Sequence, residues 1–306
     1  MFSVIFPGQG SQMVGMGKEL LTNYESVKKL FSEANDILDF SITDLILNGP
    51  KEKLDLTENT QPAIFLISYS IFNVIKNEHG IKLNNAKYFA GHSLGEYTAL
   101  AASEALNFSE TLKILKLRGK AMQSAVPEGE GGMLAVLGSD IEKVEKDIKK
   151  FDCEIANDNS NGQIVVSGKV NQLNNLALEL KNKSIKNIKL PVSAPFHCKL
   201  MKKATEIMKD ELNKINFKQS KNELISNVTA REVSEPNEIK KLLIQQIESR
   251  VRWRESIIYM ISKGIHEFVE IGPGKVLSGL IKRIDKNVKV STINNEEDIT
   301  KLNIND

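Results

Sequence analysis

One pentapeptide, Gly91-His92-Ser93-Leu94-Gly95, limits the folds open to this chain more than any other feature. Residues 87–90 before it predict a strand, and residues 94–102 after it predict a helix. Where a strand turns sharply into a helix, the turn lifts the central side chain clear of the backbone, and small flanking residues prevent clashes. The pattern therefore predicts an α/β fold with Ser93 at a helix N-terminus, although a plain Gly-Ser turn also produces it.

Hydrophobic periods divide the chain into three zones. The first, residues 2–122, alternates strands with amphipathic helices, as α/β folds do. The second, residues 132–191, follows the order βαββαβ. The third resumes the α/β pattern. We expect strands at 2–6, 87–90, 133–137, 153–156, 163–167, 185–190, 266–271 and 288–293, and helices at 13–23, 62–76 with Pro62 in its first turn, 109–122, 141–150, 170–181, 199–213, 252–263 and 275–284.

The predicted fold class is therefore α/β: a large α/β-hydrolase-like body with a parallel sheet, plus an inserted ferredoxin-like (βαββαβ) small domain. Turn-forming prolines and glycines flank the insertion on both sides. We place the large catalytic domain at residues 1–126 and 196–306, and the small domain at residues 127–195.

Composition excludes several classes of function. The chain has 41 basic and 39 acidic residues, so the positive surface of a nucleic-acid-binding protein is missing. No apolar stretch approaches the roughly 20 residues of a membrane span, and the first residues contain no targeting signal, so we expect a cytoplasmic protein. With two isolated cysteines and no metal-ligand spacing, we expect no disulfide framework, no metal and no cofactor.

The serine needs a base, because a hydroxyl becomes nucleophilic when a neighbour takes its proton, and histidine is the usual base at neutral pH. Of the four histidines, His79 lies in a polar helix end, His266 begins a strand, and His92 is expected to shape the pocket. His197 is the best candidate, unless it is an ordinary loop residue. No acidic residue is close to it in sequence, so we expect a dyad with Ser93 in which a backbone carbonyl orients the imidazole.

Arg118 lies on the apolar face of its predicted helix. At about 100° per residue, the lysines of residues 109–122 share one face and the apolar residues share the other, and Arg118 is in the middle of the second. A buried guanidinium needs an anion, and its planar fork fits a carboxylate. The anion is an internal acidic residue or belongs to the substrate, unless the side chain bends outward to water. In the substrate case, the acyl group ends in a carboxylate.

The first predicted strand ends in the loop Pro7-Gly8-Gln9-Gly10-Ser11-Gln12, whose glycines allow backbone N–H groups to approach a ligand. Nucleotide motifs do not fit. A dinucleotide fingerprint needs glycine in place of Met13, and a P-loop needs glycine at Gln12 and Ser or Thr at Glu19. We expect the loop to supply an oxyanion-hole donor that pairs with the N–H of Leu94.

Five segments, taken in order, resemble the malonyl-CoA:acyl carrier protein transacylase family of fatty-acid synthesis over nearly the whole chain. They are Pro7-Gly8-Gln9-Gly10-Ser11-Gln12, Gly91-His92-Ser93-Leu94-Gly95-Glu96, Arg118, Ala194-Pro195-Phe196-His197 and Gly272-Pro273-Gly274-Lys275-Val276-Leu277. The resemblance implies ping-pong transfer: Ser93 attacks the malonyl thioester of coenzyme A with His197 as base, and the phosphopantetheine thiol of acyl carrier protein then takes the malonyl group. Malonyl-CoA and acyl carrier protein are the implied partners, and coenzyme A is part of a substrate rather than a cofactor.

The resemblance also implies roles for residues around the dyad. Arg118 holds the malonyl carboxylate, and the backbone N–H groups of Gln9 and Leu94 form the oxyanion hole. The carbonyl that orients the histidine belongs to Gln246, or to its neighbour Gln245.

Three further residues are expected to bind substrate. His92 shapes the pocket, and Asn159 contacts the pantetheine arm. Phe196 leaves little room for an α-methyl group, a discrimination worth about 1–3 kcal/mol. Basic residues at the mouth of the cleft are expected to dock the acidic carrier protein.

Two other functions fit parts of the pattern. A thioesterase or carboxylesterase would share the nucleophile and the oxyanion hole, but would have no use for a carboxylate clamp at Arg118. A silent scaffold that only docks carrier protein would not need Ser93, His197 and Arg118 together. We therefore predict an acyltransferase, a malonyl-CoA:acyl carrier protein S-malonyltransferase, and leave open whether its carrier serves fatty-acid or polyketide synthesis.

Overall fold

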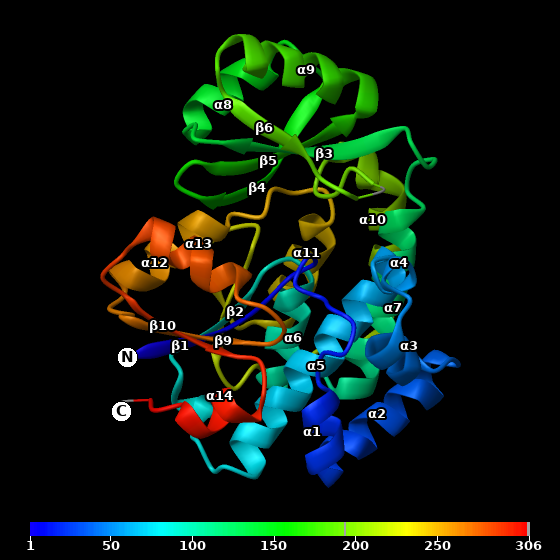
Figure 1. Cartoon of the computed structure of the whole chain (residues 1–306), viewed down its shortest axis with the longest axis vertical. Coiled ribbons are helices and arrows are strands. Elements are labelled where there is room, and N and C mark those ends of the chain that lie inside the picture. The colour runs from blue at the N-terminus through cyan, green and yellow to red at the C-terminus, as the bar shows by residue number, and fades with distance from the viewer. Residues whose placement is uncertain (193, 305–306) are drawn as a thin grey trace.

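The computed structural model describes residues 1–192 and 194–304, which form two sheets with helices packed against them (Figure 1). The larger sheet has the strand order β10-β9-β1-β2-β7-β8, and every neighbouring pair is parallel except β7 and β8. Its strands are β1 (Phe2–Phe6), β2 (Tyr88–Gly91), β7 (Glu223–Ile225), β8 (Glu232–Val233), β9 (Glu267–Ile271) and β10 (Lys289–Ile293). Because β1 and β2 are parallel neighbours, the loops that follow them meet at one edge of the sheet.

Helices cover both faces of this sheet. They are α1 (Lys18–Asn23), α2 (Glu25–Leu38), α3 (Ile42–Asn48), α4 (Lys51–Leu54), α5 (Thr57–Asn77), α6 (Leu94–Ala102), α7 (Phe108–Gln123), α10 (Lys202–Lys214), α11 (Pro236–Gln246), α12 (Trp253–Ser262), α13 (Val276–Ile284) and α14 (Glu296–Lys301), with the short turns η1 (Leu83–Asn85) and η2 (Lys199–Met201). Alternate residues of β1 enter different apolar cores, since successive side chains of a strand point to opposite faces. Val4 and Phe6 join the core that contains α5, α6 and α7, whereas Ile5 joins a second core with α12 and α13.

The smaller sheet is antiparallel, with the strand order β4-β5-β3-β6. Along the chain its elements are β3 (Gly131–Leu137), α8 (Ile141–Ile148), β4 (Cys153–Ser160), β5 (Gln163–Lys169), α9 (Val170–Asn182) and β6 (Lys186–Lys189). Both helices lie on the face turned away from the larger sheet (Figure 1). A third apolar core, which includes Val136, Val144 and Leu176, lies between these helices and the strands.

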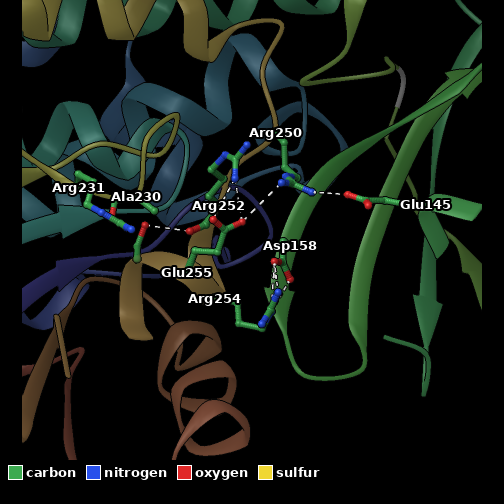
Figure 2. A network of polar contacts seen from close by, with 9 residues as sticks. Glu145, Asp158, Ala230, Arg231, Arg250, Arg252, Arg254 and Glu255 are labelled. Carbon is green, nitrogen blue, oxygen red and sulfur yellow. Dashed lines mark hydrogen bonds and ion pairs between the residues drawn. The ribbon is translucent and has the colours of Figure 1, made fainter. Parts of the chain in front are cut away.

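The start of α12 and the segment before it tie the smaller sheet to the larger body, and Figure 2 shows the contact of Arg254 with Asp158. Val251 donates a backbone hydrogen bond to Ala156 at 2.8 Å and accepts one from Asp158 at 2.9 Å. The buried carboxylate of Asp158 also binds the guanidinium of Arg254, with Oδ2 2.8 Å from Nη2 and Oδ1 2.9 Å from Nε. Because Asn159 follows Asp158 directly, these contacts fix the position of Asn159 as well.

The predicted mixed α/β fold, with a parallel sheet and a second antiparallel sheet, is confirmed. Two predicted helix starts were wrong. Helix α5 begins at Thr57, more than a turn before Pro62. The polar residues Thr57, Thr60 and Gln61 are buried within this helix and do not form a surface loop before it. Helix α1 begins at Lys18 and not at residue 13, because Gly15 and Gly17 have φ values of 89° and 73°, which a right-handed helix excludes.

The prediction omitted several elements, namely α2, α3, α4, α11, α14, β7 and β8. Strand β7 has three residues, too few to show a period of its own. The domain boundaries at residues 126/127 and 195/196 stay predictions. In the part of the chain that the structure describes, no helix combines the length and the apolar character that a membrane span requires.

Gly91 lies against α6 and Gly95 lies against the end of β1, in both cases with no space for a side chain. A Cβ on Gly91 would lie 1.9 Å from the carbonyl carbon of Gly95, and a Cβ on Gly95 would lie 2.3 Å from the carbonyl oxygen of Phe6. These neighbours are backbone atoms, which no rotamer change can move away. The strand-turn-helix geometry therefore requires glycine at both positions.

Replacing Gly95 with Ala tests this packing. We expect Gly95→Ala to lower the free energy of unfolding by about 3 kcal/mol or more, the upper range of overpacking costs, because the clash is with backbone. Urea denaturation measures the change. The matched control is Gly279→Ala, since a Cβ there meets nothing within 4 Å; we expect it to be neutral or to stabilise by about 0.4–1 kcal/mol. Equal effects of the two substitutions would contradict the packing argument.

Candidate active site

Ser93 lies between β2 and α6 in a backbone conformation that residues other than glycine rarely adopt, with φ 53° and ψ −107°. Such geometry costs about 1–3 kcal/mol and persists only where the surroundings impose it. His197, on the loop before η2, also has a positive φ, of 58°. Both predicted members of the dyad are thus held in strained backbone, which is characteristic of functional sites.

A chain of hydrogen bonds joins Ser93, His197 and Gln246. Ser93 Oγ lies 2.8 Å from His197 Nε2, and His197 Nδ1 lies 2.8 Å from the backbone carbonyl oxygen of Gln246. A carbonyl oxygen only accepts, so Nδ1 carries the proton and Nε2 is the nitrogen that can take one from Ser93. The orienting carbonyl is therefore that of Gln246 rather than Gln245.

The surroundings of His197 keep its imidazole uncharged. The side chain is buried. This burial, together with the nearby charge of Arg118, lowers the pKa of His197 from 6.5 to about 3. At neutral pH the ring is therefore neutral, which is the form that accepts a proton from a serine hydroxyl.

Arg118 lies in the larger core and reaches the serine. It is only 1% exposed, and its guanidinium donates to Gln61 Oε1 at 2.8 Å, Gln246 Oε1 at 2.7 Å and Ser93 Oγ at 3.1 Å. These acceptors are all uncharged, and within the described residues the Nε–H has no acceptor. The side chain neither bends out to water nor pairs with these neighbours as an ion. A buried cation with a spare donor beside a hydroxyl is suited to bind an anion.

The side chain of Gln246 links Arg118 to a buried carboxylate. Because its Oε1 accepts from Arg118, its Nε2 faces the other way, and donates to Glu96 Oε2 at 2.7 Å and to the carbonyl oxygen of Ser93 at 3.1 Å. Burial raises the pKa of Glu96 to about 7. The charge of Arg118 is thus partly balanced through an amide, which leaves the guanidinium without a carboxylate of its own.

Gln9 and Leu94, the predicted oxyanion-hole residues, follow two neighbouring strands. Neither backbone N–H has an acceptor within residues 1–192 and 194–304. Leu94 is the first residue of α6, where N–H groups are unpaired and the helix dipole favours negative charge. The side chain of Gln9 donates to Thr57 Oγ1 at 3.2 Å, which holds the loop in place. An oxyanion-hole role for the two residues stays a prediction.

The structure brings two of the predicted substrate-binding residues together. His92 Nε2 lies 2.9 Å from Asn159 Oδ1, so the turn at residues 91–95 between β2 and α6, here called the elbow, contacts the smaller sheet. The ring centroids of His92 and Trp253 are 5.7 Å apart. Phe196 is buried directly before His197, and its carbonyl accepts from Ser167 Oγ at 2.6 Å. Contacts of His92, Asn159 and Phe196 with substrate stay predictions.

Three buried polar residues of the site, Gln61, Glu96 and Asn227, have no role among those predicted from the sequence. Gln61 lies on α5 with Thr57, one turn apart, and polar residues at this spacing in an apolar helix were a usable signal. Glu96 lies among apolar residues at the start of α6, a signal of the same kind as that of Arg118. Asn227 offered no such signal, because its partners are remote in sequence.

Metal ligands do not gather in the described part of the chain, where no group of three or more His, Cys, Asp or Glu side chains is placed to hold an ion. Cys153 and Cys198 are both buried and free.

The lowered pKa of His197 predicts a pH dependence of stability. Below pH 6.5 this histidine is protonated in the unfolded chain, whereas in the folded chain it stays neutral down to about pH 3. The contribution of the neutral imidazole to the free energy of unfolding is therefore fully present above pH 6.5 and is lost as the pH falls from 6.5 toward 3. We expect the unfolding free energy of the wild type, relative to His197→Gln, to decrease by up to about 1.4 kcal/mol per pH unit. Urea denaturation at pH 5.0–7.5 measures it, and parallel curves for the two proteins would contradict it.

This chain is similar to known proteins over nearly its whole length. The family model described as "Acyl transferase domain" matches residues 3–301. The malonyl CoA-acyl carrier protein transacylase of Bacillus subtilis (strain 168) is 43% identical over 302 residues, which are 96% of this chain and 94% of the relative.

Solved structures extend the comparison. An acyl-carrier-protein-S-malonyltransferase from Bartonella henselae superposes with a TM-score of 0.95 at 40% identity, covering 98% of this chain and 97% of the other. A malonyl-transacylase solved in complex with a type II PKS acyl-carrier protein superposes with a TM-score of 0.94 at 35% identity, covering 98% of both chains. The chain therefore belongs to the acyl transferase domain family, among the malonyl CoA-acyl carrier protein transacylases.

Proposed function

We propose that this protein is an acyltransferase that moves a malonyl group from malonyl-CoA to the phosphopantetheine thiol of acyl carrier protein, through a malonyl ester on Ser93, for fatty-acid synthesis. The observation that carries the proposal is the buried guanidinium of Arg118, 3.1 Å from Ser93 Oγ, with only uncharged acceptors around it. An acyl group on Ser93 that ends in a carboxylate places this anion beside the guanidinium. The identification of this acyl group as malonyl and of the acceptor as acyl carrier protein rests on the similarity to malonyl CoA-acyl carrier protein transacylases.

In the first half-reaction, His197 Nε2 takes the proton of Ser93 as Oγ attacks the thioester carbonyl of malonyl-CoA. The carbonyl oxygen becomes an oxyanion, for which we assign the N–H groups of Gln9 and Leu94 as donors. The tetrahedral intermediate then expels the thiolate of coenzyme A. His197 returns its proton to this thiolate, so coenzyme A leaves as the thiol and the malonyl ester remains on Ser93.

The second half-reaction reverses these roles. His197 takes the proton of the phosphopantetheine thiol, and the thiolate attacks the ester carbonyl. Collapse releases Ser93 Oγ, which recovers the proton from His197. The products are malonyl carrier protein and the free enzyme.

Binding of the malonyl carboxylate also strengthens the base. In the free site, burial lowers the pKa of His197 and the charge of Arg118 lowers it further. A carboxylate paired with Arg118 offsets this charge and raises the pKa of His197 toward the range of an effective general base. The clamp therefore couples recognition of the acyl group to activation of Ser93.

The proposal also covers the two domains, the substrate pocket and the location of the enzyme. We describe residues 127–195 as a ferredoxin-like small domain and residues 1–126 and 196–306 as an α/β-hydrolase-like body, supported by the strand order β4-β5-β3-β6 with both helices on one face. His92 shapes the pocket, Phe196 limits substituents on the acyl group, and Asn159 contacts the pantetheine arm. The reaction proceeds between two thioesters without a further cofactor, and we place the enzyme in the cytoplasm.

Mass spectrometry of the intact protein tests the acyl intermediate. We expect malonyl-CoA to add one malonyl group to the wild type and none to Ser93→Ala, because Oγ is the acceptor atom. The adduct should persist in buffer and disappear when acyl carrier protein in its phosphopantetheine form is added. Rapid turnover to free malonate without carrier would favour the thioesterase alternative, and an absence of any adduct would favour the scaffold.

Replacing Arg118 tests the carboxylate clamp. We expect Arg118→Ala to lower kcat/KM for malonyl-CoA by about 100-fold or more, the range for losing one partner of a buried charge pair. Because the anion requirement is removed, the variant should accept acetyl-CoA better relative to malonyl-CoA. Arg118→Lys keeps the charge without the planar fork, so we expect its kcat/KM for malonyl-CoA to lie between the values of the wild type and Arg118→Ala. An unchanged acetyl-to-malonyl ratio in folded Arg118→Ala, checked by its melting temperature, would refute the clamp.

A further inference from the structure

The strained backbone of Ser93 needs a support that the elbow does not itself provide. On its helical side, Glu96 donates its N–H to the carbonyl of Ser93 at 3.1 Å, as the first turn of α6 closes. On its strand side, His92 donates to the carbonyl of Phe6 at 3.1 Å, which extends the pairing of β2 with β1. The N–H of Ser93 itself points to neither element.

Asn227 binds the two sides of the elbow at once. Its Nδ2 donates to the carbonyl oxygen of Gly91 at 2.7 Å, and its Oδ1 accepts the N–H of Ser93 at 2.7 Å. The side chain is only 1% exposed, so water does not compete for these bonds. One planar amide thus spans the residue before and the residue after His92.

The backbone of Asn227 is fixed as firmly as its side chain. Its N–H donates to Glu96 Oε2 at 3.1 Å, and its carbonyl accepts from the N–H of Arg252 at 2.9 Å. Because the main-chain and side-chain polar groups of Asn227 are all engaged, the amide has no freedom to leave the elbow.

The sheet register explains why a side chain is needed here. Strand β7 pairs in parallel with β2 up to Ile225 opposite Ala90. Continued by two residues, this register sets Asn227 level with His92, but β2 has by then turned away into the elbow and main-chain pairing ends. The amide of Asn227 has the donor and the acceptor of a peptide group and continues the ladder around the turn.

We propose that Asn227 is a positioning residue that holds the backbone of Ser93 in the conformation that sets Oγ 2.8 Å from His197 Nε2. This inference rests on the proposed role of Ser93 as the nucleophile. It also bears on the oxyanion hole: since Asn227 occupies the N–H of Ser93, the N–H of Leu94 is the donor left at the elbow.

The same strand supplies a matched control. Asn222, at the other end of β7, is also buried, and its Nδ2 donates to the carbonyl oxygens of Asn84 and Ala86, both at 2.9 Å, just before β2. Asn222 therefore also links the ends of β7 and β2 through a buried side-chain amide, although it does so through Nδ2 alone, and its Oδ1 has no partner among the described residues. Only Asn227 makes such a link at Ser93.

The first measurement compares Asn227→Ala and Asn222→Ala in rapid-quench acylation by malonyl-CoA, followed by intact mass. We expect Asn227→Ala to lose about 100-fold in the rate of acylation, as a misplaced nucleophile does, with the KM for malonyl-CoA within about threefold of wild type because Arg118 is untouched. The acylation rate of Asn222→Ala should lie within about threefold of the wild-type rate, even if its melting temperature falls as much as that of Asn227→Ala. Equal rates for the two variants would overturn the proposal.

A second variant covers the case in which Asn227→Ala does not fold. Asn227→Asp keeps the acceptor for the N–H of Ser93, but sets an oxygen against the carbonyl of Gly91. We expect it to acylate about tenfold more slowly than wild type, because one of the two hydrogen bonds is lost. Acylation of Asn227→Asp at the wild-type rate would overturn the proposal.

Backbone amide hydrogen exchange separates this inference from the proposed function. In Asn227→Asp or Asn227→Ala, the amides of residues 91–93 should exchange at least about tenfold faster than in wild type, and in Asn222→Ala they should be unchanged. Unaltered exchange in the Asn227 variants would refute the positioning role. If wild-type Ser93 takes up no malonyl group, the proposed function fails, and the exchange data still decide whether Asn227 holds the elbow.

Discussion

The burial of the Arg118 guanidinium is the constraint on which the rest of the site depends. A cation removed from water must be surrounded by acceptors, and Gln61 and Gln246 provide them while the ring of Tyr97 lies 5.4 Å away. Holding Gln246 in this role also fixes its backbone carbonyl, which orients His197. One charged side chain on α7 therefore organises residues from α5, α6 and α11 around the nucleophile.

The way this charge is balanced explains why the site remains available to an anion. Glu96 is linked to Arg118 through the amide of Gln246. A carboxylate bound directly to the guanidinium would occupy the fork that an acyl carboxylate needs. Burial raises the pKa of Glu96 to about 7, so its negative charge is itself only partly developed at neutral pH. The neutral glutamine between the two groups keeps the cation available.

The two sheets contribute differently to the same site. The larger sheet brings the loop after β1 and the elbow after β2 to one edge, which is where parallel α/β sheets place their ligands. The smaller sheet contributes Asn159, which its neighbour Asp158 locks to the larger body through Arg254. The contact between His92 and Asn159 therefore joins the elbow after β2 to the smaller sheet.

Local chemistry was enough for part of this picture. The turn at Ser93 follows from glycine spacing, the positions of most strands along the chain from their apolar periods, and the burial of Arg118 from its place on one helical face, all properties of short segments. Only the tertiary structure showed that the carbonyl of Gln246 rather than Gln245 contacts His197 and that α5 begins before Pro62. It also showed that the side chain of Asn227 forms hydrogen bonds with both sides of the elbow. The physical reason is that a polar residue is predicted to lie at the surface from its own sequence. Its burial depends on a hydrogen-bond partner that is remote in the chain and that only the fold brings close. Asn227 meets Gly91 and Ser93 only because β7 lies beside β2, and no local pattern records that pairing.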